Sequence, residues 1–220
     1  MDMMAIRRRV LMGFKKARLP KEYREVEYIE STQEQYIDTG YSPNINTELI
    51  CDFGSFSFVT SDGGGNYRGP YGCSDTSNNA RAGISKAQGA SRVYTSFGNK
   101  VDITYITTGT SSWANRTLHS LSKNGVYENG INVLLPYSNL SFGETNKHIF
   151  VFARSSNDGM AERFVEMKLY KFSIKENDVL IKEFIPCYRK SDEEIGLYDT
   201  VSKTFYTNAG TGTFLKGADV

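Results

Sequence analysis

The stretch RFVEMKLYKFSI, residues 163–174, decides the fold of this protein. Its apolar residues first alternate with polar ones and then shift by one position. The two apolar sets are Val165, Met167 and Leu169, and then Tyr170, Phe172 and Ile174. Alternation with period two is typical of a half-buried β-strand, and a change of parity within a strand predicts a β-bulge.

Strand patterns continue along the chain from residue 23 onward. Residues 47–59 predict a second long strand, with a bulge at Gly54. Asn129-Gly130 and Asn124-Gly125 are signals for type I′ hairpins. Shorter strands are predicted at 80–85, 91–97, 101–107 and 147–153. Many short strands with frequent turn signals predict an all-β protein with two antiparallel sheets packed as a sandwich.

Acidic residues gather near YIESTQEQYIDTG, residues 28–40. On one strand, Glu25 and Glu27 would share a face at roughly 6–7 Å, close to the about 5–5.5 Å between the carboxyl groups of a retaining glycosidase. The alternative is two strands, 23–30 and 35–39, whose acids lie on solvated faces. We predict the second arrangement and no catalytic role, because the acids alternate with apolar residues.

The composition is that of a soluble globular protein, with 23% charged and 39% hydrophobic residues among 220. Charge is uneven: residues 1–20 hold six basic groups and one acid, whereas residues 21–220 hold 20 basic and 24 acidic groups. The slight acidic excess of residues 21–220 therefore predicts no nucleic-acid surface on this part of the chain. No apolar run is long enough for a membrane span or a signal peptide, so we expect no membrane span and no export.

The segment AIRRRVLMGFKKA, residues 5–17, has the only clear helical period. Apolar residues recur at spacing four, and basic residues take the opposite face. So short a helix is marginal unless its apolar face is buried. We therefore predict an amphipathic arm, residues 1–20, that docks on other subunits, followed by one domain, residues 21–220. The docking residues are Ile6, Arg7, Arg8, Arg9, Val10 and Phe14.

Four stretches resemble a known family. They are LPKEYREVEYIESTQEQYIDTGY (19–41), SKNGVYENGI (122–131), KLYKFSI (168–174) and EFIPCYRKSDEEIGLYDTVSKTFYTNAGTGTF (183–214). They are similar to proteins of gut bacteria and their phages that carry a concanavalin A-like, laminin G-type jelly roll. The resemblance implies a jelly-roll sandwich, and it implies a role among phage structural proteins because such genes often accompany the family.

Aromatic and polar residues in loops 61–72 and 109–116 suit a glycan, because sugar C–H faces pack on rings while sugar hydroxyls form hydrogen bonds. The candidate glycan-binding residues are Trp113, Tyr67, Tyr71, Arg68, Asp62 and Asn115. The alternative is that these aromatics cap sheet edges. Relatives with bound Ca²⁺ suggest Asp62 or Asp75 as ligands, but no loop has the ligand spacing, so we predict no metal or cofactor.

We predict structural roles for the other residues with reactive side chains. Cys51, Cys73 and Cys187 form no CxxC pair and are expected to be buried thiols. His119 and His148 have no partner at metal-ligand spacing. The sequence has no GxSxG, HExxH or P-loop motif, and residues 208–213 contain G-x-G without a third glycine.

These patterns predict a non-catalytic protein, and the resemblance implies a component of a phage or prophage virion, in a tail, a fibre or a head decoration, synthesised in the bacterial cytoplasm without a signal peptide. Its jelly roll would bind glycans or a host surface, and its arm would bind other virion proteins or sister subunits. Two alternatives stay open: a purely architectural virion protein without sugar binding, and a glycoside hydrolase.

Overall fold

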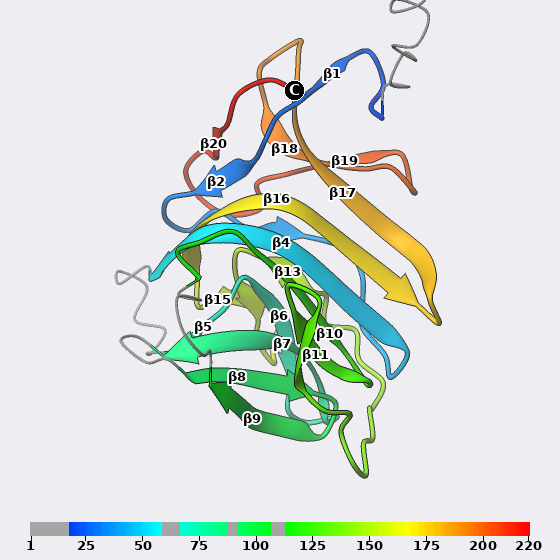
Figure 1. The fold of residues 1–220 in the computed structure, drawn as a ribbon. Coiled ribbons are helices and arrows are strands. Elements are labelled where there is room, and N and C mark those ends of the chain that lie inside the picture. The colour runs from blue at the N-terminus through cyan, green and yellow to red at the C-terminus, as the bar shows by residue number, and fades with distance from the viewer. Residues whose placement is uncertain (1–17, 59–66, 88–91, 107–112) are drawn as a thin grey trace, which may run out of the picture.

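The computed structural model describes residues 18–58, 67–87, 92–106 and 113–220. These residues form two antiparallel β-sheets packed face to face, which confirms the predicted all-β sandwich. Figure 1 shows the long strands β4, β16 and β17 in one layer and the shorter strands β6 to β9 in the other. The predicted arm, residues 1–20, lies outside the described residues, apart from Arg18, Leu19 and Pro20.

The first sheet contains the longest strands. Its hydrogen-bonded order is β12 (Ile131–Leu134), β11 (Gly125–Glu128), β10 (Thr117–Ser122), β4 (Thr47–Phe58), β16 (Val165–Glu176), β17 (Val179–Arg189), β18 (Ile195–Asp199) and β19 (Thr204–Thr207). Beside this path, β1 (Tyr23–Glu25) pairs with β17, and β2 (Ile29–Ser31) pairs with β16 and with β20 (Leu215–Lys216).

The second sheet follows the order β15 (Ala161–Glu162), β14 (Arg154–Ser155), β6 (Tyr71–Asp75), β7 (Ala80–Ala87), β8 (Arg92–Phe97) and β9 (Lys100–Ile106). Two short strands extend it: β5 (Tyr67–Arg68) pairs with β7, and β13 (Phe150–Val151) lies between β6 and β3 (Ile37–Asp38). Its pairs are antiparallel except for the contact of Ser155 in β14 with Cys73 in β6, which is parallel.

Both predicted bulges are present where β4 pairs with β16. The register shifts between Leu169 and Lys171, so that Tyr170 is the extra residue, and it shifts again beside Gly54, where Ser55 has a φ of 53°. Tyr170 is not buried with its predicted set. Its ring is half-buried, and the guanidinium carbon of exposed Arg116 lies over it, 4.0 Å from the ring centroid. The bulge therefore turns Tyr170 toward the outer face.

The two halves of the opening stretch do not pair with each other. The strands are shorter than predicted, and Ile29 in β2 belongs to the first sheet whereas Ile37 in β3 belongs to the second. Both isoleucines are fully buried. The chain between them crosses from one sheet to the other, so the repeated Tyr-Ile-acid pattern anchors one isoleucine in each layer.

The stretch from Asn208 to Thr213 fixes this crossing. The side-chain oxygen of Asn208 accepts a hydrogen bond from the Tyr36 amide at 3.1 Å, and the Gln35 side chain donates to the Thr213 carbonyl at 3.3 Å. Figure 1 places the C-terminus beside β1, and β20 beside β2. The G-x-G pattern is therefore a structural turn that joins the two ends of the chain.

Hairpin signals were correct at one turn and displaced at the other. Asn129 and Gly130, between β11 and β12, both have positive φ, at 52° and 80°, as a type I′ turn requires. Gly125 pairs with Ser122, so the turn between β10 and β11 is Lys123-Asn124, one residue earlier than predicted. Gly125 has a φ of 102°, and a Cβ there would lie 2.1 Å from the Leu134 carbonyl oxygen.

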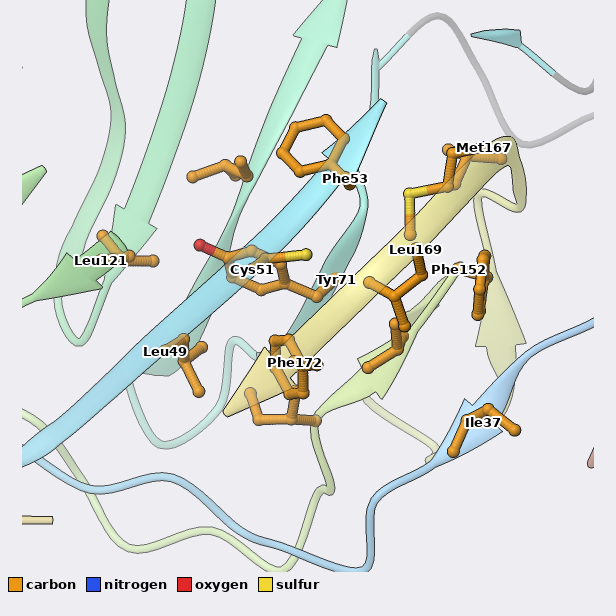
Figure 2. Packing of buried hydrophobic residues seen from close by; sticks show 14 of the residues in the cluster. Ile37, Leu49, Cys51, Phe53, Tyr71, Leu121, Phe152, Met167, Leu169 and Phe172 are labelled. Atoms are coloured by element: carbon orange, nitrogen blue, oxygen red, sulfur yellow. The ribbon is translucent and has the colours of Figure 1, made fainter. Parts of the chain in front are cut away.

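The core lies between the two sheets and is rich in aromatic rings. Figure 2 shows Leu49, Cys51 and Phe53 of β4 beside Leu169 and Phe172 of β16, all of them fully buried. Complete burial of a side chain of this size contributes about 1.5–3 kcal/mol. All three cysteines are buried free thiols, as predicted.

A chain of polar groups crosses this core. His119 of β10 contacts the hydroxyl of Tyr71 at 3.0 Å through Nδ1 and that of Tyr105 at 3.2 Å through Nε2. Tyr105 donates its own proton to Glu128 at 3.2 Å. His119 Nε2–H therefore donates to Tyr105, and Nδ1 accepts from Tyr71. Complete burial lowers the pKa of His119 to about 3, so the imidazole is neutral and ties the first sheet to the second.

Among the described residues, no helix is long and apolar enough to cross a membrane.

Candidate ligand-binding site

Strand β7 builds the floor of a hollow on the outer face of the second sheet, the face turned away from the first sheet. Its sequence, ARAGISKA, alternates strictly at first: Ala80, Ala82 and Ile84 are buried, whereas Arg81 and Gly83 face outward. The outward side of the strand therefore presents one long cationic side chain beside bare backbone.

Two glycines face each other across this floor. Gly83 of β7 pairs with Gly72 of β6. A Cβ on Gly83 would lie 3.0 Å from both the Gly72 Cα and the Tyr71 carbonyl oxygen, so the two backbones approach closely. Because neither residue has a side chain, the sheet surface is hollowed at this pair.

Arginines and an aromatic ring stand around the floor. We call the site the arginine hollow and define it by Gly83, Tyr67, Arg81, Arg154 and Arg163. The serines on the same lining, at 74, 85 and 96, add hydroxyl groups.

The ring of Tyr67 lies at the rim. It is 40% exposed, and it contacts the ring of Tyr94 edge-on, with centroids 4.8 Å apart and planes at 88°. The carbonyl of Tyr67 accepts a hydrogen bond from the Arg163 side chain at 3.3 Å. This contact links the rim to the arginines, so the ring is held beside the polar floor.

The carboxylate of Glu162 contacts two of the three arginines. Arg154 donates from Nε to Glu162 Oε1 at 3.0 Å, and Arg163 Nε lies 3.9 Å from the same oxygen. The Arg154 side chain also crosses over Gly72, with its Cγ 3.5 Å from where a Cβ would be. Among the described residues, the guanidinium of Arg81 makes no hydrogen bond or ion pair.

The structure separates the predicted glycan-binding residues. Trp113 and Tyr71 are each 1% exposed and Arg68 is 3% exposed, so none of them presents its side chain to solvent. Tyr67 and Asn115 are exposed, and Asp62 lies outside the described residues. The rings of Trp113 and Tyr71 therefore belong to the core, and the structure does not present them at the surface where a glycan contact was predicted.

Packing explains the burial of Trp113. Its ring lies edge-on against Phe53 and Phe56, at centroid distances of 5.4 Å and 4.9 Å. Its backbone carbonyl accepts a hydrogen bond from the Phe56 amide at 2.9 Å. The bulge at Ser55 brings Phe56 into reach, so the tryptophan fills the end of the sandwich beneath β4.

Some residues of the hollow were missed in the sequence. The alternation in 80–87 contained the signal for Arg81 and Gly83, since it already separated them from the buried alanines. Arg154 gave no such signal, because it reaches the hollow through the parallel contact between β14 and β6. Sequence spacing says nothing about that contact.

The acids of the opening stretch lie on solvated faces, as predicted. Glu25 forms an ion pair with Arg18, Glu27 is exposed, and Glu30 lies 3.9 Å from the Lys168 ammonium. All three belong to the segment beside the first sheet. None of them lines the arginine hollow.

Asp75, the second residue considered for Ca²⁺, is held by other side chains. Its carboxylate accepts hydrogen bonds from Thr145 at 2.8 Å and from the Asn78 side chain at 3.0 Å. Burial acts to raise its pKa, but these bonds outweigh it and hold the pKa below the ordinary value. Within the described part of the chain, no three His, Cys, Asp or Glu side chains gather as a metal site.

The fold and the site thus define a two-sheet antiparallel β-sandwich with an arginine-lined hollow on one outer face. No protein-family model matches the sequence, and neither a curated protein nor a solved structure gives a significant match.

Proposed function

We propose that this protein is a non-catalytic, lectin-like component of a phage or prophage particle, and that it binds a glycan of the host surface in the arginine hollow. The observation that carries the proposal is the exposed ring of Tyr67 beside a floor of bare backbone and serine hydroxyls. Aromatic rings pack on the C–H faces of sugars, and hydroxyls and arginines bond sugar oxygens.

The distribution of carboxylates supports a non-catalytic role. A glycosidase needs two carboxyl groups that flank one bond. Among the described residues, Glu162 is at the edge of the hollow, and Arg154 and Arg163 both contact its carboxylate. Glu25 and Glu27 lie elsewhere, on a solvated segment next to the first sheet.

The particle context rests on the sequence resemblance, which leads us to infer a concanavalin A-like, laminin G-type jelly roll. The stretches that carry the resemblance at the two chain ends contact each other, as between Tyr36 and Asn208. None of the resembling stretches lines the arginine hollow. The resemblance therefore supports the fold and the context, and the hollow supports the ligand.

The N-terminal arm is the proposed attachment to the particle or to sister subunits. Its apolar stripe would pack on a partner, while its arginines pair with acidic groups. Deletion of residues 1–18 should leave the melting temperature of the remaining chain unchanged and prevent its incorporation into particles. Normal incorporation of the shortened chain would contradict the attachment role.

A glycan array probed with the full chain tests the binding proposal. We expect a defined set of glycans to bind, and we expect Tyr67→Ala to weaken that binding by about 1–3 kcal/mol, as for other aromatic anchors. Tyr127→Ala is the matched control, because Tyr127 is 39% exposed and lies on the first sheet.

The outcomes separate the three functions. Binding that depends on Tyr67 and not on Tyr127 supports the proposal. A folded protein that binds no glycan would favour the purely architectural role, and release of reducing sugar from a bound glycan would identify a glycoside hydrolase.

A further inference from the structure

The described lining of the arginine hollow is cationic, because it contains Arg81, Arg154 and Arg163. No acidic residue is among the described residues that line it. Glu162, at its edge, is shared by Arg154 and Arg163. Arg81 adds a third guanidinium without a partner among the described residues.

Two other arginines of the described chain, Arg116 and Arg189, are paired with carboxylates. Arg116 holds Asp52 through two nitrogens, at 2.9 Å and 2.7 Å, and Arg189 holds Asp192 at 3.0 Å and 2.7 Å. These two-point contacts are the geometry in which a guanidinium binds a carboxylate best. Arg81 keeps the same pair of donors for a group outside the chain.

The surroundings of Arg81 leave space for such a group. Arg81 is half-buried, so water does not fully surround its side chain. Ser74 lies directly opposite it on β6, and Gly83 follows two residues later on the same face. A planar anion can lie against the bare backbone of Gly83 while it faces Arg81.

We infer that the arginine hollow binds an anionic group carried by the glycan, a carboxylate or a sulfate ester, and that Arg81 is its two-point anchor. The inference rests on the proposed function and names the class of its ligand as acidic glycans. Arg154 borders the same space and adds a second positive charge. The ring of Tyr67 then contacts the neutral part of the sugar at the rim.

Paired probes that differ only in charge test the inference. Titrations of the full chain would compare oligogalacturonate with its methyl ester, and dextran sulfate with dextran. We expect each acidic probe to bind about 10- to 100-fold more tightly than its neutral counterpart, the range for hydrogen bonds to charged groups. The preference should weaken as salt is added.

Variants of Arg81 assign the effect to one side chain. Arg81→Gln should bring the ratio of acidic to neutral affinity close to one, and Arg81→Lys should give an intermediate ratio because the charge stays and the planar fork is lost. Arg24→Gln is the control, since it makes the same charge change on the exposed strand β1. It should leave the ratio unchanged.

Failure of this inference is distinguishable from failure of the proposed function. Equal affinity for acidic and neutral probes, or an unchanged ratio in Arg81→Gln, would overturn the anionic ligand while glycan binding on the array still stood. Inorganic sulfate that binds as tightly as oligogalacturonate would mean a small-anion site and would also overturn the inference. No binding to any array glycan or probe would overturn both.

Discussion

The outer faces of the two sheets differ in how their charged side chains are paired. On the first sheet, cations and anions are matched across neighbouring strands: Lys175 with Glu48 at 3.1 Å, Lys171 with Glu183 at 2.6 Å, and Arg116 with Asp52 at 2.7 Å. On the second sheet, Arg154 and Arg163 contact the same carboxylate, that of Glu162, and the guanidinium of Arg81 has no partner among the described residues. On the first sheet these side-chain charges are already paired, so a bound ion would add little stabilisation. On the second sheet a bound anion would pair with Arg81, so we expect the ligand there.

The largest expected effect comes from truncating the core beneath the first sheet. Trp113→Ala should lower the free energy of unfolding by about 3–5 kcal/mol, because it leaves a cavity between Phe53 and Phe56. Chemical denaturation would measure this. Once the variant is folded, its glycan affinity should equal that of the wild type.

Trp113→Phe sharpens the same comparison. It keeps an aromatic ring and removes the indole N–H, which is buried and has no hydrogen-bond partner in the described structure. We expect a much smaller loss of stability than for Trp113→Ala. A change in glycan affinity with either folded variant would contradict the assignment of Trp113 to the core alone.

A second prediction concerns pH and the polar chain between the sheets. His119 has a folded pKa of about 3, below its ordinary value of 6.5. The unfolded chain therefore takes up a proton as the pH falls below about 6.5, and the native chain does not. Stability is complete above that pH, and it should fall by about 1.4 kcal/mol per pH unit as the pH drops through the window toward about 3.

Unfolding curves between pH 6.5 and 5 cover the upper part of this window, and the variant His119→Gln gives the share of the slope that belongs to this histidine. His119→Gln should cost about 1–3 kcal/mol at pH 7, since Tyr71 and Tyr105 lose part of their hydrogen bonding. The same variant should flatten the slope between pH 6.5 and 5. An unchanged slope would show that His119 is not the group that titrates.

The smallest expected effect compares two arginines directly. Arg116→Gln breaks an ion pair with Asp52 and a contact with the Tyr170 ring, and it should cost about 0.5–1 kcal/mol of stability. Arg81→Gln breaks no side-chain hydrogen bond or ion pair among the described residues and should stay within about 0.5 kcal/mol of the wild type. Thermal melts of both variants would check this. A larger loss for Arg81→Gln than for Arg116→Gln would mean that Arg81 has a structural role.

Local patterns in the sequence predicted most of the strands. The alternation in 163–174 and 47–59, with their bulges, and the turn at Asn129 depend on neighbouring residues, which the sequence displays. The strand pairing of residues 28–40, by contrast, depends on contacts with distant residues. Period two buries Ile29 and Ile37 correctly, but it carries no information about which sheet each residue joins.

The candidate site was harder to predict for a related reason. The composition of a loop suggested that Trp113 and Tyr71 bind a ligand, but composition does not tell which way a ring points, and contacts with distant Phe53 and His119 turn both rings inward. Arg81 could have been found from the alternation in 80–87. Arg154 depends on a contact between strands that lie far apart in the sequence.

An amide-resolved NMR titration of the full chain with oligogalacturonate tests the central claim most directly. If the unmatched face of the second sheet is the binding face, the shifted amides will cluster at Tyr67, from Arg81 to Ser85, and at Ser96. The amide signals of Asp52, Leu118 and Lys171 on the first sheet will keep their chemical shifts. Shifts that cluster on the first sheet and leave Arg81 and Gly83 unmoved would contradict the claim.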